Sequence, residues 1–483
     1  MIRALVVLVA LIAGWVGALW FLIAPDFNHW PLREMAALHA LPPVGLWTAW
    51  QFWRRWRIGK AAALAADREA ALSKENEAQI AAARCAHAEE MARRQFGCDC
   101  RAVALAQVVV PDGLENSPVP EGDGVYWSQI QPDSPDEDLA VSAADFLGAG
   151  VDEALRGVYA YCPAAATFPI YIVPPPDTVG EQAVAAVRQI QRKLFIELDI
   201  DLETPTEYGR VLFLRSRDGA GNSVIELFEN NPELPGAVVL AFDSPWLRAA
   251  LQGEEEERPE RPRNGSPSQG VFAVFVTNPR LPEMLSELPV QQGGFDVMTP
   301  YWEKGAAVAA RSAFLAGLSQ SLRESLIAMP ALARIHRTVS STFAGKAERP
   351  MEFARALGGI IEQAQINAGL VDVPFVAAVD NIPEERESAA PACGWLVHNA
   401  GDVDVCGKRL AGISVAMAKR GYDLDPIESA TNVVIQLGDL GEARSVAMLA
   451  IAAARAADTS EPVLCAEFSG RDDVSLYFAC PMN

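Results

Sequence analysis

The chain has 483 residues, of which 50% are hydrophobic, and its formal net charge is −22. Residues 1–60 hold six basic side chains against two acidic ones, so the rest of the chain carries −26. A body this acidic is repelled by nucleic acid, which excludes a nucleic-acid-binding function. The length predicts two or three domains with a sizeable core.

Two apolar stretches open the sequence. Residues 5–24 are apolar or small and carry no charge, which is enough helix to cross a hydrocarbon core of roughly 30 Å. The second stretch, residues 36–53, is interrupted by His39 and the Pro42-Pro43 pair. We therefore predict a membrane anchor over residues 1–57, with one or two transmembrane helices.

A basic cluster follows the second stretch and sets the expected orientation. Positively charged flanks prefer the cytoplasmic side, so we expect a protein of the bacterial inner membrane whose body faces the cytoplasm. A cleaved signal peptide fits poorly, because the apolar run is too long and lacks a small-x-small site. An uncleaved anchor with a periplasmic body, for example an immunity protein, is the alternative. The cluster is Arg54, Arg55, Arg57 and Lys60, and the tryptophans that could lie in the interface are Trp47, Trp50, Trp53 and Trp56.

Residues 58–97 are rich in alanine and charge and contain no proline. Strong helix formers dominate, and Gly97 stands where a helix C-terminal glycine is expected. Large apolar residues are sparse. This segment is predicted to be a solvated helical stalk.

The remainder alternates between short apolar runs and amphipathic segments, which predicts an α/β fold. We expect an N-terminal α/β lobe over 98–250, an acidic, proline-rich linker or loop over 251–270, and a C-terminal α/β lobe over 271–483. The predicted strands are 102–110, 168–173, 210–214, 237–242, 271–276, 375–379, 432–437, 463–468 and 474–480. The predicted helices are 144–161, 180–195, 306–329, 408–420 and 442–456, the last capped by Asp439 with Glu442 as its reciprocal partner.

Local motifs for metals and cofactors are weak. Eight cysteines are spread without regular spacing, which favours reduced thiols. The pair Cys98 and Cys100 is one residue too close for the usual metal or redox motif. The run 438–441 (GDLG) lacks the full phosphate-binding fingerprint, so it is interpreted as tight strand-to-helix packing. We predict no cofactor, no metal and no catalytic residue.

One set of residues, a cysteine and two histidines, suggests a catalytic site. Cys162, His336 and His398 occur in the order found in thiolase-like condensing enzymes, which need a thiolate at a helix N-terminus and histidines to activate it. Cys162 precedes Pro163 without the small-residue motif of those enzymes. His336 lies in an apparently helical run and His398 at the end of a strand. An acyl-transferring enzyme that uses Cys162 is therefore kept as an alternative, and a degenerate, non-catalytic thiolase-like fold is favoured.

A family resemblance points to another function. The runs 395–401 (WLVHNAG), 407–410 (GKRL) and 432–448 resemble the lipase-effector adapter family of type VI secretion systems. The resemblance implies a two-lobed, membrane-anchored adapter without catalysis. Such an adapter binds a lipase-type toxin and helps to load it onto the secretion spike protein. We expect these two protein partners, and a membrane through the N-terminal helix.

Overall fold

The structure is a computed structural model. The chain forms two compact units, Met1–Ala88 and Glu89–Asn483, and each is described by itself. The residues that the structure describes are 2–23, 31–109, 117–129, 139–173, 179–200, 210–214, 219–252, 265–286, 315, 318–343, 349–375, 392–422, 424–469 and 473–482. Most of the predicted linker, most of the strand 375–379 and the first part of the helix 306–329 lie outside these residues.

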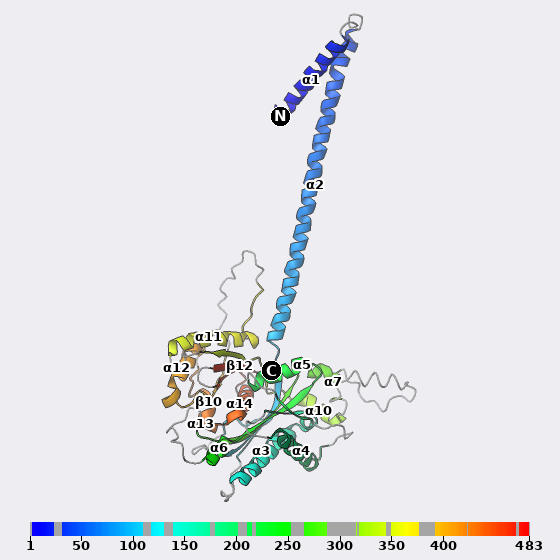
Figure 1. Ribbon diagram of the computed structural model, residues 1–483. Helices are drawn as coiled ribbons and strands as arrows, with labels where there is room; N and C mark the ends of the chain where they lie inside the picture. The colour runs from blue at the N-terminus through cyan, green and yellow to red at the C-terminus, as the bar shows by residue number, and fades with distance from the viewer. Residues whose placement is uncertain are drawn as a thin grey trace, which may run out of the picture. The chain divides into compact units, whose positions relative to one another are not determined.

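The first unit contains α1 (Ile2–Ile23) and the larger part of α2 (Leu32–Arg94) (Figure 1). α2 passes through Pro42 and Pro43 without a break and includes most of the predicted stalk. The Trp15 indole N–H donates to the Leu38 carbonyl at 2.9 Å and ties the two helices together. Within the described part of the chain, no helix combines the length and the apolar character needed to cross a membrane, so the predicted transmembrane helices are not found there.

The second unit is built on one mixed sheet in the order β10-β9-β11-β12-β7-β1-β6-β5-β3-β4, with β2 beside β1 and β8 beside β12. The strands are β1 (Cys98–Val109), β2 (Val125–Gln129), β3 (Ile170–Val173), β4 (Val211–Phe213), β5 (Gly236–Asp243), β6 (Gln269–Thr277), β7 (Ala333–Ile335), β8 (Val339–Thr342), β9 (Trp395–His398), β10 (Ala430–Asn432), β11 (Val463–Ser469) and β12 (Asp473–Pro481). The helices are α3 (Leu139–Tyr161), η2 (Pro163–Thr167), α4 (Gly180–Glu197), α5 (Ala220–Asn230), α6 (Pro245–Gln252), α7 (Leu281–Ser286), α10 (Gln320–Ala328), α11 (Pro350–Asn367), α12 (Val403–Lys419), α13 (Val433–Leu437), η4 (Gly441–Ala443) and α14 (Arg444–Thr459).

The sheet consists of two halves with the same topology. In the first half, β4, β3 and β5 are parallel, and β6 and β1 continue antiparallel. In the second half, β10, β9 and β11 are parallel, and β12 and β7 continue antiparallel. The halves join where β1 pairs with β7. The helices follow the same order, so α5 and α14 occupy equivalent places in the two halves.

Strand alternation separates the body into layers. Residues Val103 and Leu105 of β1 belong to a central core with α5 and α14, whereas Ala102 and Ala104 belong to an outer core with α3 and α4. A third core packs α11 and α12 against the outer face of the second half. α14 therefore lies between the two halves, with α3 and α4 on one side of the body and α11 and α12 on the other (Figure 1).

The central helix α14 is largely buried and is rich in small side chains. Ten of its sixteen residues are buried, and six of these ten are alanines. Small side chains let strands of both halves approach the helix closely, and alanine is also the strongest helix former. Apolar residues lie on most sides of α14, as expected for a helix that is buried all round.

The mixed α/β fold is confirmed, but several local predictions are wrong. Residues 433–437, predicted as strand, form the helix α13, and His336 follows strand β7 and is not helical. Residue Asp439 does not cap α14: the helix begins at Arg444, and the Asp439 carboxylate accepts from the Gly441 N–H at 3.0 Å. The short 3-10 helix η4 directly precedes α14, and the sequence spacing did not predict it.

Candidate functional site

A cavity of about 660 Å³ lies where the N-termini of α5 and α14 meet the ends of β3 and β11. Parallel strands of α/β proteins present ligand sites at their carboxyl ends, which is where β3 and β11 reach the cavity. The lining is rich in hydroxyl groups and carboxylates. It consists of Val173, Gly219, Ala220, Ser340, Ser341, Thr342, Gly441, Glu442, Arg444, Ser445, Glu467, Ser469, Asp473, Val474 and Ser475.

Two helix N-termini are joined directly inside this cavity. Ala220 is the first residue of α5, and its N–H donates to the Ser445 hydroxyl oxygen at 2.8 Å. Gly219 precedes it with φ at +88°, in the region that favours glycine. A Cβ at Gly219 would lie 3.4 Å from the Ser445 Oγ and 3.5 Å from the Glu467 Oε2. Both contacts are ordinary, so the backbone conformation, and not space, favours glycine at the start of α5.

Glu467 brings a carboxylate into the same space from the end of β11. Its side chain is 12% exposed, and burial raises the pKa of this carboxyl above its usual range. The Arg444 guanidinium and a hydrogen bond with the Ser445 hydroxyl oppose the rise in pKa, whereas the nearby Glu442 carboxylate adds to it. A carboxylate with a raised pKa is a stronger base, which suits it to take up a proton in a reaction.

Arg444 is the cation of the cavity. Its Nε lies 3.9 Å from the Glu467 Oε1, too far for a hydrogen bond. Among the described residues this buried Nε has no hydrogen-bond partner. A buried donor without a partner is costly, so this atom is free to receive an acceptor atom of a bound molecule.

The backbone around Glu467 is fixed by a buried amide. Asn399, at the end of β9, accepts from the Phe468 N–H at 2.7 Å and donates to the Phe468 carbonyl at 3.0 Å. This reciprocal pair clamps the strand end that carries Glu467. On the rim, the Thr342 hydroxyl donates to the Asp473 carboxylate at 2.6 Å. The cavity wall is thus held by bonds between elements of the second half.

The structure places Cys162 elsewhere. Its side chain is fully buried in the outer core of the first half, at the start of the short helix η2, and it does not line the cavity. Burial raises the pKa of this thiol to about 12. A thiol held protonated at neutral pH is a poor nucleophile. The residues that begin the two long helices at the cavity are Ala220 and Arg444, not cysteine.

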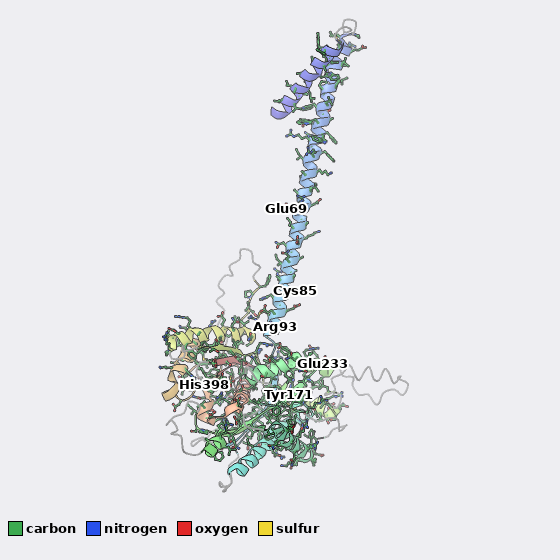
Figure 2. The ribbon with its side chains drawn as sticks, in the orientation of Figure 1. Glu69, Cys85, Arg93, Tyr171, Glu233 and His398 are labelled. Carbon is green, nitrogen blue, oxygen red and sulfur yellow. The ribbon has the colours of Figure 1, made fainter. Side chains whose placement is uncertain are left out.

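The two histidines are also separate from Cys162 and from the cavity. His336 has its Nδ1 3.1 Å from the Asn367 carbonyl, and His398 has its Nε2 3.2 Å from the Pro426 carbonyl. His398 follows Val397, which faces the central core, so alternation turns the histidine to the outer face of the second half (Figure 2). Burial lowers the pKa of each imidazole to about 4. The constellation predicted from chain order is therefore not assembled.

Cys98 and Cys100 lie on β1, where both thiols are buried. Between them, Asp99 forms a two-bond ion pair with Arg334 of β7, at 2.7 and 3.2 Å. The pair spans the junction of the two halves of the sheet. In the described residues, no group of three or more histidine, cysteine or acidic side chains could hold a metal ion.

The glycine run 438–441 packs tightly, but it joins the helix α13 to η4 and not the predicted strand to a helix. Gly438 and Gly441 both have positive φ, and a Cβ at Gly441 would overlap the Asp243 carboxylate. Asp243 in turn accepts from the Glu442 N–H at 2.8 Å and pairs with Arg248. The run therefore seats the start of α14 against β5 and leaves no room there for a phosphate.

Comparisons with known proteins concern the body of the chain. No protein-family model and no curated protein matches it. Solved structures that match include a type III pentaketide synthase from Neurospora crassa, at 11% identity and a TM-score of 0.42. A 3-oxoacyl-[acyl-carrier-protein] synthase III from Aquifex aeolicus (12%, 0.39) and a human mitochondrial 3-ketoacyl-CoA thiolase (10%, 0.38) also match. Each match covers 80% of this chain and 100% of the other.

The likeness to these solved structures is one of fold alone. The prediction of a type VI secretion adapter is wrong: the comparisons find no adapter, toxin-delivery protein or secretion component among the matches given above, but synthases and a thiolase. The prediction that the body has no catalytic function is corrected with it. The predicted roles in toxin delivery and spike loading are wrong for the same reason.

Sequence reasoning missed the residues that line the cavity. Ser445 and Glu467 are 22 positions apart, and neither belongs to a motif. The available signal was an acidic residue inside the apolar strand 463–468 and a glycine pair ahead of an alanine-rich helix. A charged residue in a buried strand is uncommon unless it is paired, which marks it for attention.

Proposed function

We propose that the protein is an acyl-transferring enzyme whose reaction takes place in the cavity between the N-termini of α5 and α14. The observation that carries this proposal is the position of Ser445. Its hydroxyl accepts from the Ala220 N–H and hydrogen-bonds to the Glu467 carboxylate, whose pKa is raised by burial. A hydroxyl paired with a base of raised pKa is the arrangement of an activated nucleophile.

The step follows from this geometry. The Ser445 oxygen attacks the carbonyl carbon of a thioester or ester, and its proton passes to the Glu467 carboxylate. The negative charge that develops on the carbonyl oxygen is favoured by the positive ends of α5 and α14 and by Arg444. When the tetrahedral intermediate collapses, the bond to the leaving thiol or alcohol breaks, and the leaving group takes the proton from Glu467. An acceptor nucleophile then removes the acyl group from Ser445 by the reverse sequence.

The full-length protein, incubated with short acyl thioesters and with p-nitrophenyl esters, tests this proposal. The expected result is thiol or nitrophenol release and an acyl adduct on Ser445 in the mass spectrum. Ser445→Ala abolishes the adduct, and Glu467→Gln slows release on the order of 100-fold. Cys162→Ala is the matched control and leaves both readouts unchanged. An adduct on Cys162, or release that survives Ser445→Ala, contradicts the proposal.

We also propose that residues 1–57 attach the protein to a membrane, with the body on the cytoplasmic face. The sequence supports this through the uncharged stretch 5–24 and the basic residues Arg54 to Lys60. A reporter fused after Lys60 tests the side: a reporter that is active only in the cytoplasm is expected, and one active only in the periplasm reverses the proposed topology.

A further inference from the structure

We infer that residues 47–60 of α2, called the collar below, bind the anionic phospholipid headgroups of a membrane surface, which rests on the membrane attachment proposed above. Three successive pairs place a cation over an indole ring. Arg54 lies 5.6 Å from the Trp50 ring centroid, Arg57 4.7 Å from Trp53 and Lys60 5.2 Å from Trp56. All three distances are within the range of a cation–π interaction.

The direction of the three pairs is the same. In each pair the cation stands four residues after the tryptophan, one helical turn toward the charged part of α2. Trp53 and Trp56 are about half exposed, at 50% and 54%, so their rings are available to a surrounding medium. Indoles prefer the boundary between hydrocarbon and headgroups, whereas cations prefer the phosphate layer just outside it. Each pair therefore offers an indole to that boundary and a cation to the phosphate layer.

The arrangement around the helix selects one mode of contact. Three residues turn an α-helix by about 300°, so each tryptophan is displaced by about 60° from the one before. The three tryptophans therefore span about 120° and lie on one side of α2. A helix that lies along a bilayer turns one such side toward it. The collar can therefore meet the headgroup layer with this side of α2.

The sequence on either side of the collar is consistent with this position. The stretch 36–53 on its N-terminal side is mostly apolar, and the helix beyond Lys60 is rich in charge. The collar is also the basic part of a chain whose remainder carries −26, so an anionic surface attracts it while the body is repelled. The partner is thus a membrane with anionic lipid, and nucleic acid is the class that the test must separate from it.

Vesicle flotation with the full-length protein tests the collar. Vesicles of phosphatidylcholine alone are compared with vesicles that also contain phosphatidylglycerol, at low and at high salt. The wild type is expected to bind the anionic vesicles more tightly, and salt is expected to reduce the difference. The triple variant Arg54→Gln, Arg57→Gln, Lys60→Gln is expected to lose about fivefold in that preference per cation, on the order of 100-fold in all, while binding to neutral vesicles stays unchanged.

A second triple variant on the same helix is the control. Arg68→Gln, Lys74→Gln, Arg84→Gln removes the same charge at positions that have Leu64, Ala70 and Ile80, not tryptophan, four residues before them. This control is expected to retain most of the preference for anionic vesicles. Equal losses in the two triple variants, an unchanged preference in the first, or binding to a DNA duplex in place of vesicles overturns the inference. None of these readouts depends on the acyl-transfer activity.

Discussion

The backbone N–H of Ala220 and the hydroxyl of Ser445 are joined by a 2.8 Å hydrogen bond that links the first residue of α5 to the second residue of α14. These helices occupy equivalent places in the two halves of the body. The bond therefore ties together two repeats that meet at the candidate site. It also fixes the orientation of the hydroxyl that faces the Glu467 carboxylate.

Gly219→Ala is expected to impair the site more than the fold. The added methyl would make an ordinary contact with the Ser445 Oγ at 3.4 Å, but an alanine at φ +88° costs about 1–2 kcal/mol of stability. We expect acyl release to fall about tenfold or more, because relief of this backbone strain moves the Ala220 N–H that holds the Ser445 hydroxyl. Gly221→Ala, two residues on, meets only ordinary contacts at 3.7–3.9 Å and serves as the control. Equal activity of both variants in the ester assay would show that Gly219 has no special role.

The acyl-transfer rate is expected to rise with pH across a window above the ordinary glutamate pKa of about 4.3. Burial raises the pKa of Glu467, and the base works only when it is ionised, so the rising limb marks its deprotonation. Glu467→Gln cannot titrate and should remove that limb along with most of the rate. The measurement is the pH–rate profile with the p-nitrophenyl ester. A limb that persists in the variant would assign it to another group.

Folding stability is expected to fall as the pH is lowered from about 6.5 to 4. His336 and His398 have folded-state pKa values lowered to about 4, below the unfolded value, so the unfolded chain binds more protons in this window. Their stabilising effect is fully present above the unfolded pKa and is lost toward the folded pKa, about 3 kcal/mol for each. Urea unfolding at several pH values measures it. His398→Gln should flatten the dependence, and a variant that keeps the full dependence would contradict the assignment to this residue.

Arg334→Met is expected to destabilise the body by about 3–5 kcal/mol, because it leaves the Asp99 carboxylate buried without its cation. The double variant that also carries Asp99→Asn removes the stranded charge and should recover part of the loss. The exposed pair Arg349–Glu352 gives the comparison, and Arg349→Met there should change stability by less than about 1 kcal/mol. Chemical denaturation measures all three. Similar losses at the two pairs would mean that burial does not decide the cost.

The sequence by itself determined the class of fold and most of its elements. Residues 237–242 and 271–276 form β5 and β6, and residues 463–468 and 474–480 form the closing hairpin, because buried strands appear as continuous apolar runs between turn residues. In a short apolar run, hydrophobic periodicity does not distinguish a strand from a helix. Residues 433–437, an apolar run of five, became α13.

Only the tertiary structure decided the site. Cys162, His336 and His398 were candidates through chemistry and chain order. Cys162 instead lies in the outer core of the first half at the start of η2, whereas both histidines face carbonyl groups of the second half. Ser445 and Glu467 meet because α14 and β11 are adjacent in the second half, and Gly219 joins them because α5 is the counterpart of α14 in the first. These contacts depend on long-range pairing of strands, which no local sequence pattern predicts. The hydrophobic periodicity of a single strand or helix, in contrast, is visible within a few residues.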